Sequence, residues 1–317
     1  MTNYDVVTVG AAVLDIFMRS EKFKVVQSND LPGGIAMCQV YGGKMEVEQV
    51  VITTGGGATN TAVSFARKEL KTAVIAEMGN DPQALLIHKE LEEDGVDTRY
   101  LVQEANETTA VSVILIADDG GRSIMVHRGA SAMLSKRDMP LEDLETKWLY
   151  ISSLGGNMDL LKNLINWAKL KKIRVALNPG TKEIEHRDKL LSMLSSVEML
   201  FVNREEAGKL WGIDFSDDAL WSSLQPLPGA HVSVITDGAR GGKVSIAGKV
   251  HFYEGEKVKK VVDTTGAGDA FASGYVAAVV YGKSYESAIM WGKKNATAVL
   301  SAVGAKKGLL TLSEISK

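Results

Sequence analysis

The second half of the chain repeats one pattern, in which a short apolar run is followed by a longer segment with helical spacing of its apolar residues. The runs that predict strands lie at 148–152, 173–177, 198–202, 232–236 and 243–247. Helices are expected between them, and then at about 268–281 and 284–301. Strands that alternate with helices in this way are typical of a mostly parallel sheet covered on both faces. The pattern therefore predicts an α/β fold.

The first half of the chain begins in the same manner. "DVVTVG" at 5–10 and "TAVIAEMG" at 72–79 predict two more buried strands. A helix is expected within 55–70, after a glycine-rich loop, and another at 82–95, which has proline in its first turn and glycine at its end. The strand and helix alternation thus extends almost to the N-terminus.

Two segments break this alternation. The stretch "IAMCQVYGGKMEVEQVVIT" at 35–53 holds two β-like runs joined by Gly42 and Gly43, which is a signal for a two-residue hairpin turn. The segment at 108–129 predicts a second hairpin that turns at "DDGG". Because hairpins do not fit a parallel sheet, we expect them to form a small β element that projects from it.

We therefore expect a single α/β domain over 1–317 that carries a lid built from segments at about 16–54 and 97–128. A length of 317 residues suits one large domain. The net charge of −3 and the lack of a basic cluster argue against a nucleic-acid partner. No apolar run is long enough to span a membrane, and the N-terminus lacks the basic region of a signal peptide. The lone Cys38 fits a reducing compartment, so we expect a cytoplasmic protein without nucleic-acid or membrane partners.

The stretch "VVDTTGAGDAFASGYVAAVVYG" at 261–282 carries the strongest chemical signal. Gly266, Ala267 and Gly268 precede a predicted helix, where free N–H groups and the positive end of the helix dipole bind anions. Asp269 follows them directly. A carboxylate beside a bound phosphate is expected where a base must take a proton from the attacking hydroxyl. Asp269 is therefore a catalytic base of phosphoryl transfer or, alternatively, only a residue that caps the helix.

Four motifs resemble the PfkB or ribokinase-like family of sugar and nucleoside kinases. "GGGATNTAVSFAR" (55–67) is similar to the N-terminal signature of the family, and "DTTGAGDAF" (263–271) to its C-terminal signature. "VNREE" (202–206) resembles the Asn-x-x-Glu element, and "ITDGARGG" (235–242) the nucleotide-binding turn. The motifs follow the family order over nearly the whole chain. The resemblance implies a three-layer ribokinase-like fold, with helices on both sides of a mostly parallel central sheet and a small β-sheet lid.

The resemblance also implies roles on the phosphate side of the site. Asp269 would be the base, and Gly266, Ala267 and Gly268 would form the anion hole. The residues that would bind ATP are Asn203, Thr236, Gly238 and Gly241. Asn203 would also organise Mg²⁺ and its waters together with Glu206, which suits a hard cation. Asp263 and Thr265, with the backbone of 302–305, would correspond to a site for a monovalent cation such as K⁺. No Walker-type loop is expected, because the sequence has no G-x-x-x-x-G-K-[ST] string.

On the substrate side, the resemblance implies hydroxyl-binding roles for Asp15, Gly56, Gly57 and Asn60. A carboxylate and an amide together can accept and donate hydrogen bonds to a polyol. Asn60 also has a simpler interpretation, as a polar residue at a helix start. Arg128, which follows the second hairpin, would bind substrate or alternatively form a surface ion pair.

The substrate itself is less constrained. In the ribokinase branch that the motifs resemble, the strings "GSxNAD" and "GGKGAN" are expected. This chain has "GAAVLD" and "GGGATN" there, so Val13 and Gly57 stand where a polar Asn and a Lys are expected. The apolar "VLDI" looks more like the branch that phosphorylates nucleosides, such as adenosine kinases. We therefore expect an ATP-dependent kinase for a ribose- or adenosine-like hydroxyl.

Several alternatives remain open from the sequence. One is a kinase for fructose, fructose 6-phosphate or 2-keto-3-deoxygluconate, and another is a non-catalytic sensor of a sugar or nucleotide on the same fold. A dinucleotide-dependent oxidoreductase is disfavoured, since the first strand does not open into G-x-G-x-x-G. The exposed strand edges of a lid would also allow a homodimer.

Overall fold

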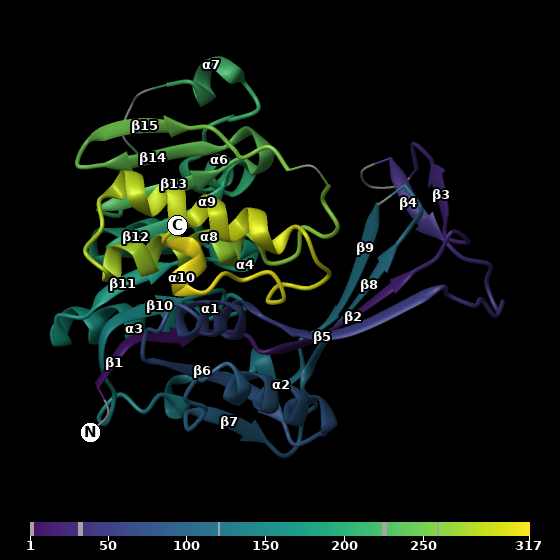
Figure 1. The fold of residues 1–317 in the computed structure, drawn as a ribbon, viewed down its shortest axis with the longest axis horizontal. Coiled ribbons are helices and arrows are strands. Elements are labelled where there is room, and N and C mark those ends of the chain that lie inside the picture. The colour runs from purple at the N-terminus through teal and green to yellow at the C-terminus, as the bar shows by residue number, and fades with distance from the viewer. Residues whose placement is uncertain (1–2, 31–33, 120, 224–226, 259) are drawn as a thin grey trace.

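The computed structural model describes residues 3–30, 34–119, 121–223, 227–258 and 260–317. Within them, a nine-stranded sheet has the order β15-β14-β13-β12-β11-β10-β1-β6-β7 (Figure 1). Its strands are β1 (Asn3–Val9), β6 (Thr72–Gly79), β7 (Leu101–Glu104), β10 (Glu145–Ile151), β11 (Arg174–Leu177), β12 (Met199–Asn203), β13 (Val232–Thr236), β14 (Gly242–Ile246) and β15 (Lys249–Tyr253). Neighbours from β13 to β7 are parallel, whereas β14 and β15 add an antiparallel edge. The predicted α/β class and mostly parallel sheet are confirmed.

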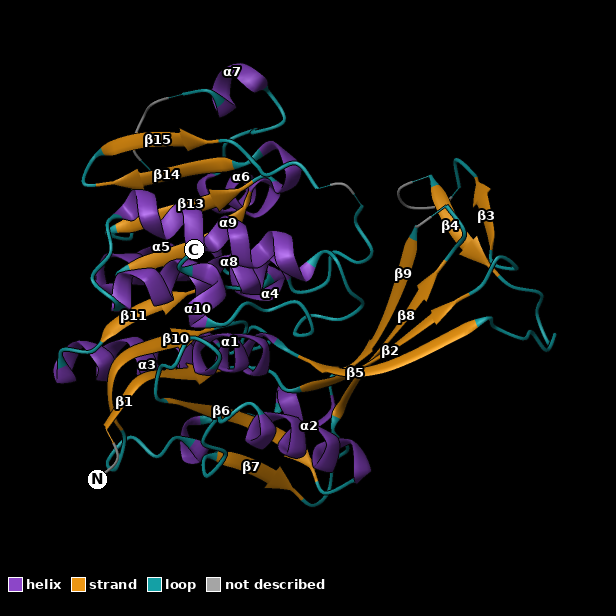
Figure 2. Ribbon diagram, in the orientation of Figure 1, coloured by secondary structure: helices purple, strands orange, loops and turns teal. Residues whose placement is uncertain are grey.

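Helices cover both faces of this sheet (Figure 2). One face packs against α3 (Met158–Lys171), α4 (Thr181–Glu185), α5 (Arg187–Met193) and α6 (Arg204–Trp211). The other packs against α1 (Gly57–Ala66), α2 (Pro82–Glu93), α8 (Ala267–Val280), α9 (Tyr285–Val299) and α10 (Leu312–Ile315). The remaining short helices are α7 (Asp218–Trp221), η1 (Gly129–Ala132), η2 (Lys136–Asp138), η3 (Leu194–Ser196) and η4 (Gly238–Arg240). The molecule thus has the three layers that the alternation predicts.

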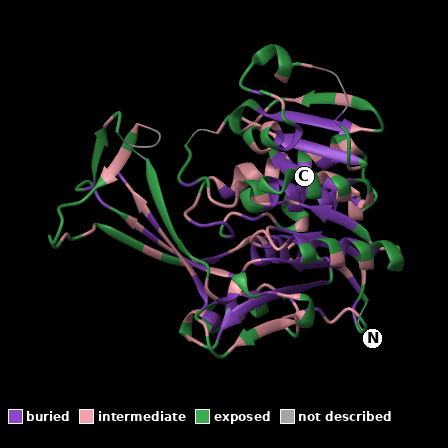
Figure 3. Ribbon diagram, turned by 180° about the vertical axis from the view of Figure 1, so that it is seen from behind, coloured by how far each residue is buried: buried purple, intermediate pink, exposed green. Residues whose placement is uncertain are grey.

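The central strands are buried because both of their faces are covered. All eight residues of β6 are buried, and neighbouring side chains enter different cores: Ile75 packs on the α3 side, and Val74 packs on the α1 and α2 side. Figure 3 shows the central strands of the large sheet as buried and much of the projecting β element as exposed. This is why the strands read as nearly continuous apolar runs in the sequence.

A second sheet projects from the body of the molecule, and we call it the lid (Figure 1). It has the strand order β5-β2-β8-β9, with β2 (Val13–Arg19), β5 (Gln49–Gly55), β8 (Ala110–Ile116) and β9 (Arg122–His127). β8 and β9 are antiparallel, which confirms the hairpin predicted at 108–129. A separate two-stranded sheet, β3 (Lys24–Gln27) with β4 (Ile35–Cys38), lies at the outer end of the lid.

Two expectations about the lid are wrong. The hairpin predicted at 35–53 does not form, because β4 pairs with β3 whereas β5 pairs with β2 along all seven of its residues. Gly42 and Gly43 lie in the connection between β4 and β5 instead. The second lid segment also begins later than residue 97, since β7 continues the parallel sheet beside β6 and only β8 and β9 enter the lid.

The lid joins the body at the carboxyl ends of the parallel strands. β1 ends at Val9 and β2 begins at Val13, while β5 ends at Gly55 and α1 begins at Gly57. In open α/β sheets, ligands bind in the crevice outside the carboxyl ends of the strands. The connections of the lid therefore lie at the edge of the sheet where a substrate is expected.

Candidate active site

The start of α8 is shaped to bind an anion. Gly266, its N-cap, adopts a left-handed φ of 75°, and a Cβ there would clash with the Cβ of Ala305. A Cβ on Gly268 would instead meet no atom within 4 Å. The N–H groups of a first helical turn have no partner inside the helix, and the helix dipole is positive there. The loop thus offers N–H donors and open space for a close backbone approach.

Asp269 follows in this first turn and is held by a residue from another helix. Its Oδ2 accepts a hydrogen bond from Nδ2 of Asn60, in α1, at 2.8 Å. Burial raises the pKa of the Asp269 carboxyl, while the Asn60 hydrogen bond and the positive charge of Lys306 oppose that rise. Among the described residues, no donor reaches Oδ1 of Asp269. One oxygen is therefore fixed and the other is left for a ligand.

Asn60 itself carries an unsatisfied acceptor. The residue is only 5% exposed, and its buried Oδ1 has no partner within the described part of the chain. Buried polar atoms in native proteins almost always have a partner, so this oxygen calls for a bound group or a water molecule. The interpretation of Asn60 as merely a polar residue at a helix start does not explain these two features. Its side chain faces the carboxylate of Asp269 instead of capping α1.

Asp15 lies on β2, where the lid leaves the body, and is 7% exposed. Burial raises the pKa of Asp15 to about 6, and a hydrogen bond from Ser112 and the charge of Lys306 oppose this rise. A Cβ on Gly55 would clash with Oδ2 of Asp15, so the neighbouring strand must carry glycine there. The packing holds a buried carboxylate at the base of the lid.

The glycine-rich loop brings α1 close to this base. Gly56 has a φ of 98°, and a Cβ there would clash with the carbonyl oxygen of Ala11. A Cβ on Gly57 would lie 2.7 Å from Cβ of Ser152 and 3.7 Å from Oδ1 of Asp269. The loop therefore packs against Ala11 and against Ser152, directly after β10, only because these positions lack side chains.

A cavity of about 220 Å³ lies over the carboxyl ends of β12 and β13. It is lined by Asn178, Phe201, Val202, Asn203, Glu206, Thr236, Thr264, Gly266, Ala267, Gly268, Asp269 and Phe271. Four elements far apart in the sequence thus bring the predicted anion hole, the predicted base and the Asn-x-x-Glu element to one cavity. Asn178 lines the same cavity. It belongs to the "NPG" string at 178–180, whose pattern predicts a strand end or, alternatively, a residue on the nucleotide side.

Asn203 and Glu206 form a capping box at the start of α6. Oδ1 of Asn203 accepts from the Glu206 N–H, and Oε2 of Glu206 accepts from the Asn203 N–H, both at 2.8 Å. Burial raises the pKa of Glu206, although the Asn203 hydrogen bond opposes it. Oε1 of Glu206 accepts no hydrogen bond from the described residues. One fixed carboxylate with a free oxygen at the anion-binding cavity fits Mg²⁺ held through water.

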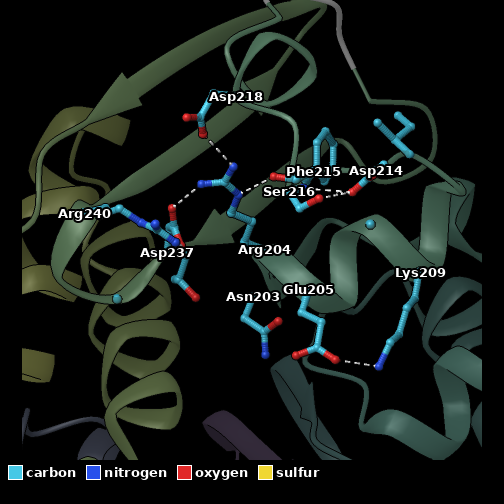
Figure 4. Close-up of a pocket in the computed structure, with 14 residues that line it drawn as sticks. Asn203, Arg204, Glu205, Lys209, Asp214, Phe215, Ser216, Asp218, Asp237 and Arg240 are labelled. Carbon is cyan, nitrogen blue, oxygen red and sulfur yellow. Dashed lines mark hydrogen bonds and ion pairs between the residues drawn. The ribbon is translucent and has the colours of Figure 1, made fainter. Parts of the chain in front are cut away.

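A larger cavity of about 760 Å³ is lined in part by the turn after β13 (Figure 4). Thr236 lines both cavities, and Gly238 lines the larger one. A Cβ on Gly241 would clash with the carbonyl oxygen of Tyr253, so this glycine lets the turn lie against β15. Arg204 lies between Asp218 and Asp237 in the larger cavity and bonds to both. The turn predicted to bind nucleotide thus borders both cavities through Thr236.

Asp263 and Thr265 do not fit a monovalent-cation site. Oδ1 of Asp263 accepts from both the N–H (3.0 Å) and the hydroxyl (2.8 Å) of Thr265, and Oδ2 accepts from the Gly304 N–H at 2.9 Å. In addition, Nη1 of Arg122 lies 3.6 Å from Oδ1. Protein donors thus fill Oδ1, and a guanidinium already lies beside the carboxylate where a cation would bind.

Arg128 is exposed at the start of η1. Its side chain makes no hydrogen bond or ion pair with the residues that the structure describes, so neither the substrate role nor the surface ion pair gains support from a contact. The structure brings Asn60 to Asp269, but it does not tie Arg128 to them.

Lys306 is a site residue that the sequence pattern did not reveal. It is 1% exposed and donates from Nζ to Thr54, beside the Asp15 strand, and to Oε2 of Glu90 at 3.1 Å. Its charge opposes the raised pKa values of Asp15 and Asp269. In "GAKKGLL" it looks like a solvated surface lysine, and only the tertiary packing buries it.

These features define a class of protein: an α/β kinase, in which an anion-binding helix start and a carboxylate lie under a β lid. The chain belongs to the pfkB family of carbohydrate kinases, whose domain matches residues 4–312. It is an ATP-dependent kinase of the sugar and nucleoside type. Among the described residues, no helix has both the length and the apolar character needed to cross a bilayer.

Relatives with different substrates resemble this chain to similar degrees. A ribokinase from Haemophilus influenzae is 28% identical over 83% of this chain and 86% of its own length. A cytidine kinase from Thermococcus kodakarensis is 30% identical over 80% of this chain and 90% of its own. The crystal structure of a probable sugar kinase from Rhizobium etli superposes with a TM-score of 0.79 at 23% identity, covering 100% of this chain and 98% of that one. The fold and reaction class are therefore shared across relatives that carry both sugar and nucleoside names.

Proposed function

We propose that this kinase transfers the γ-phosphoryl group of ATP to a hydroxyl of a nucleoside or sugar, with Asp269 as the base. The observation that carries the proposal is the Asn60–Asp269 pair, which leaves Oδ1 of Asp269 without a protein donor beside the start of α8. Oδ1 takes the proton of the acceptor hydroxyl while the hydroxyl oxygen bonds to the γ-phosphorus and ADP leaves. The N–H groups of Gly266, Ala267 and Gly268 stabilise the charge on the transferring group.

On the donor side, Asn203, Thr236, Gly238 and Gly241 shape the ATP site. Glu206 holds Mg²⁺ through water, and the bound ion neutralises phosphate charge. The support is that Asn203, Glu206 and Thr236 line one cavity with Asp269.

On the acceptor side, Asp15 and Asn60 bind substrate hydroxyls, and Gly56 and Gly57 allow the ligand to approach the backbone. The orphaned Oδ1 of Asn60 is the atom that most needs such a ligand. We also propose that Arg128, which is exposed directly after β9, acts on the acceptor side.

We favour a nucleoside as the acceptor. Ile124 and Val126 of β9 are 50% and 54% exposed, and the pairing register places Val126 in one row with Ser112 and Asp15. Residues in one row point to the same face of a sheet, so apolar surface flanks the polar Asp15. A nucleoside presents hydroxyls and an apolar ring together. Gly57 supports the same choice, since it adds no polar side chain at this position.

We also propose that the lid mediates a homodimer in the cytoplasm, where ATP is supplied. Val50, Ile52 and Met125 are 51%, 58% and 52% exposed, and the register puts them on the face opposite to Asp15. A second copy would cover this apolar face. Light scattering should give a dimer mass for the wild type and a monomer mass for Ile52→Asp. A monomeric wild type would overturn the dimer.

The function is tested by ADP release with Mg²⁺ and ATP across acceptors. The panel is ribose, fructose, fructose 6-phosphate, 2-keto-3-deoxygluconate, adenosine, cytidine, inosine and guanosine, each also run with Asp269→Asn. One strong nucleoside signal that vanishes in the variant supports the proposal. A strong sugar signal overturns the nucleoside choice, and ATP binding without any turnover supports the sensor alternative.

A further inference from the structure

An ion pair joins the lid to the loop that leads into α8. Arg122 is the first residue of β9, and its Nη1 lies 3.6 Å from Oδ1 of Asp263. The side chain of Asp263 is 5% exposed, and that of Arg122 is 41% exposed. The chain between β15 and α8 extends toward the lid (Figure 1). The pair therefore connects the projecting lid with the loop that leads into α8.

The other contacts of Asp263 tie the anion-binding loop together. Thr265 donates twice to Oδ1, and Gly304 donates once to Oδ2. Ala305, the next residue, packs against the position where Gly266 lacks a Cβ. A displacement of the Asp263 carboxylate would thus also shift Gly304, Ala305 and Gly266, the N-cap of α8.

A cation ligand must direct a free lone pair at the ion. A carboxylate offers about four lone-pair positions. Thr265 uses both positions of Oδ1, which also faces the guanidinium of Arg122, and Gly304 uses one position of Oδ2. One position on Oδ2 is left, and the positive charge of the neighbouring guanidinium disfavours K⁺ or Na⁺ there.

A buried carboxylate still needs a compensating positive charge, because burying an unpaired charge is costly. Arg122 supplies that charge in this structure, and a guanidinium stays protonated throughout the pH range of an enzyme. The charge belongs to the lid, so its contact with Asp263 depends on the position of the lid.

We propose that Arg122 replaces a monovalent cation at Asp263, so that phosphoryl transfer by this protein is independent of K⁺ and the lid itself holds the anion-binding loop in its working geometry. Arg122 is thus a positioning residue, which acts through Asp263 and does not touch the reacting atoms. The inference rests on the proposed kinase function for its effect on turnover, but not for its effect on cation binding.

The first test is turnover of the wild type in KCl, NaCl and tetramethylammonium chloride at equal ionic strength. The expected result is the same kcat in all three, within about twofold. A strong stimulation by K⁺ over tetramethylammonium would overturn the proposal.

The second test uses Arg122→Met and Arg122→Lys. In tetramethylammonium chloride, Arg122→Met should lower kcat roughly 3- to 10-fold, the scale of a partly exposed ion pair. Either added KCl or the lysine variant should restore much of that loss. Full activity of Arg122→Met without K⁺ would refute the positioning role of Arg122. A loss that neither K⁺ nor Arg122→Lys repairs would also refute it, because the positive charge would then not be the cause.

Arg19→Met is the matched control. Arg19, Ile116 and Arg122 lie in one row of the lid sheet, so both arginines are on the same face. Arg19 makes no side-chain ion pair with the described residues. Its substitution removes the same charge from the same row, and it should leave the cation profile flat. A K⁺ response in Arg19→Met equal to that of Arg122→Met would refute a specific role at Asp263.

Cation binding can be measured without any substrate. The melting temperature of the wild type should be equal in KCl and in tetramethylammonium chloride, whereas Arg122→Met should be stabilised by KCl specifically. This readout separates the two proposals, because it holds even if the acceptor is none of the compounds in the panel. Stabilisation of the wild type by K⁺ would overturn the inference and leave the kinase function intact.

Discussion

Nδ2 of Asn60 donates a hydrogen bond to Oδ2 of Asp269 at 2.8 Å, across 209 positions of the sequence. The bond joins the first turns of α1 and α8, the two helices that follow the glycine-rich loop and the anion-binding loop. It is reinforced one turn further along, where Oγ of Ser273 lies within hydrogen-bond distance of the carbonyl oxygen of Asp269 and of Oγ of Ser64, both at 2.7 Å. Helices α1 and α8 are therefore held as one unit at their first turns.

Asp269→Asn should lower kcat by roughly 10²–10⁴-fold, because a positioned base is lost while the shape of the site is kept. ATP affinity, measured by calorimetry, should change little, since the N–H groups at the start of α8 remain. Asp188→Asn, at an exposed position of α5 outside both cavities, should leave kcat near the wild-type value. Turnover of Asp269→Asn close to that of the wild type would show that another group takes the proton.

Asn60→Leu should move the acidic limb of the kcat profile to higher pH. The Asn60 hydrogen bond lowers the pKa of Asp269, so removing it raises that pKa, and a base works only when deprotonated. KM for the acceptor should rise as well, because Oδ1 of Asn60 is lost. Thr61→Val removes a neighbouring polar group that bonds only to helix carbonyls and should leave the profile in place. An unshifted limb in Asn60→Leu would argue that the bond does not tune the base.

Much of the large sheet could be predicted because its signal is local. Strands such as β12 and β13 are apolar runs of the right length, each followed by polar residues at the carboxyl end. The pairing of β4 could not be predicted in this way. A short β-like run does not specify its partner, and β3, which is fully exposed, gave no apolar pattern to mark it.

In the candidate site, too, some features could be predicted from a local pattern and others could not. Asp269 and Asn60 were found from motifs, but the bond between them depends on how α1 packs against α8. The burial of Lys306 and Lys68 was not predicted, because lysines are almost always solvated. Lys68 is fully buried and donates to Ser64, Asn295 and the Leu310 carbonyl, from elements far apart in the chain. Such burial is set by tertiary packing, which a local sequence pattern cannot predict.

Gly57→Ala should lower kcat, because its Cβ would lie 2.7 Å from Cβ of Ser152 and must push α1 away from Asp269. A misplacement of about 1 Å at a reacting group can cost on the order of 10²-fold in rate. The double variant Gly57→Ala with Ser152→Gly restores the space and should recover much of the loss. Ser152→Gly alone serves as the control. If the double variant is no better than Gly57→Ala, the loss does not come from this clash.

Asp15→Asn should stabilise the fold at neutral pH while it impairs acceptor binding. Burial raises the pKa of Asp15 to about 6, above its unfolded value of about 3.9. Above pH 6 the buried carboxylate is ionised and destabilises the folded state, by about 3 kcal/mol for a difference of about two pKa units. Below about pH 3.9 it is protonated in both states and this cost disappears.

The free energy of unfolding of Asp15→Asn should therefore exceed that of the wild type at about pH 7.5, and the gain should shrink as the pH falls from 6 toward 4. Urea unfolding at about pH 7.5 and at about pH 4 measures this difference in the free energy of unfolding. Asp118→Asn, at an exposed position of the β8–β9 turn, should show no such pH dependence. A variant that is less stable than the wild type at neutral pH would mean that the ionised carboxylate is well compensated in the folded state. A gain in stability together with a raised KM would instead mean that the fold retains a destabilising charge because the acceptor needs it.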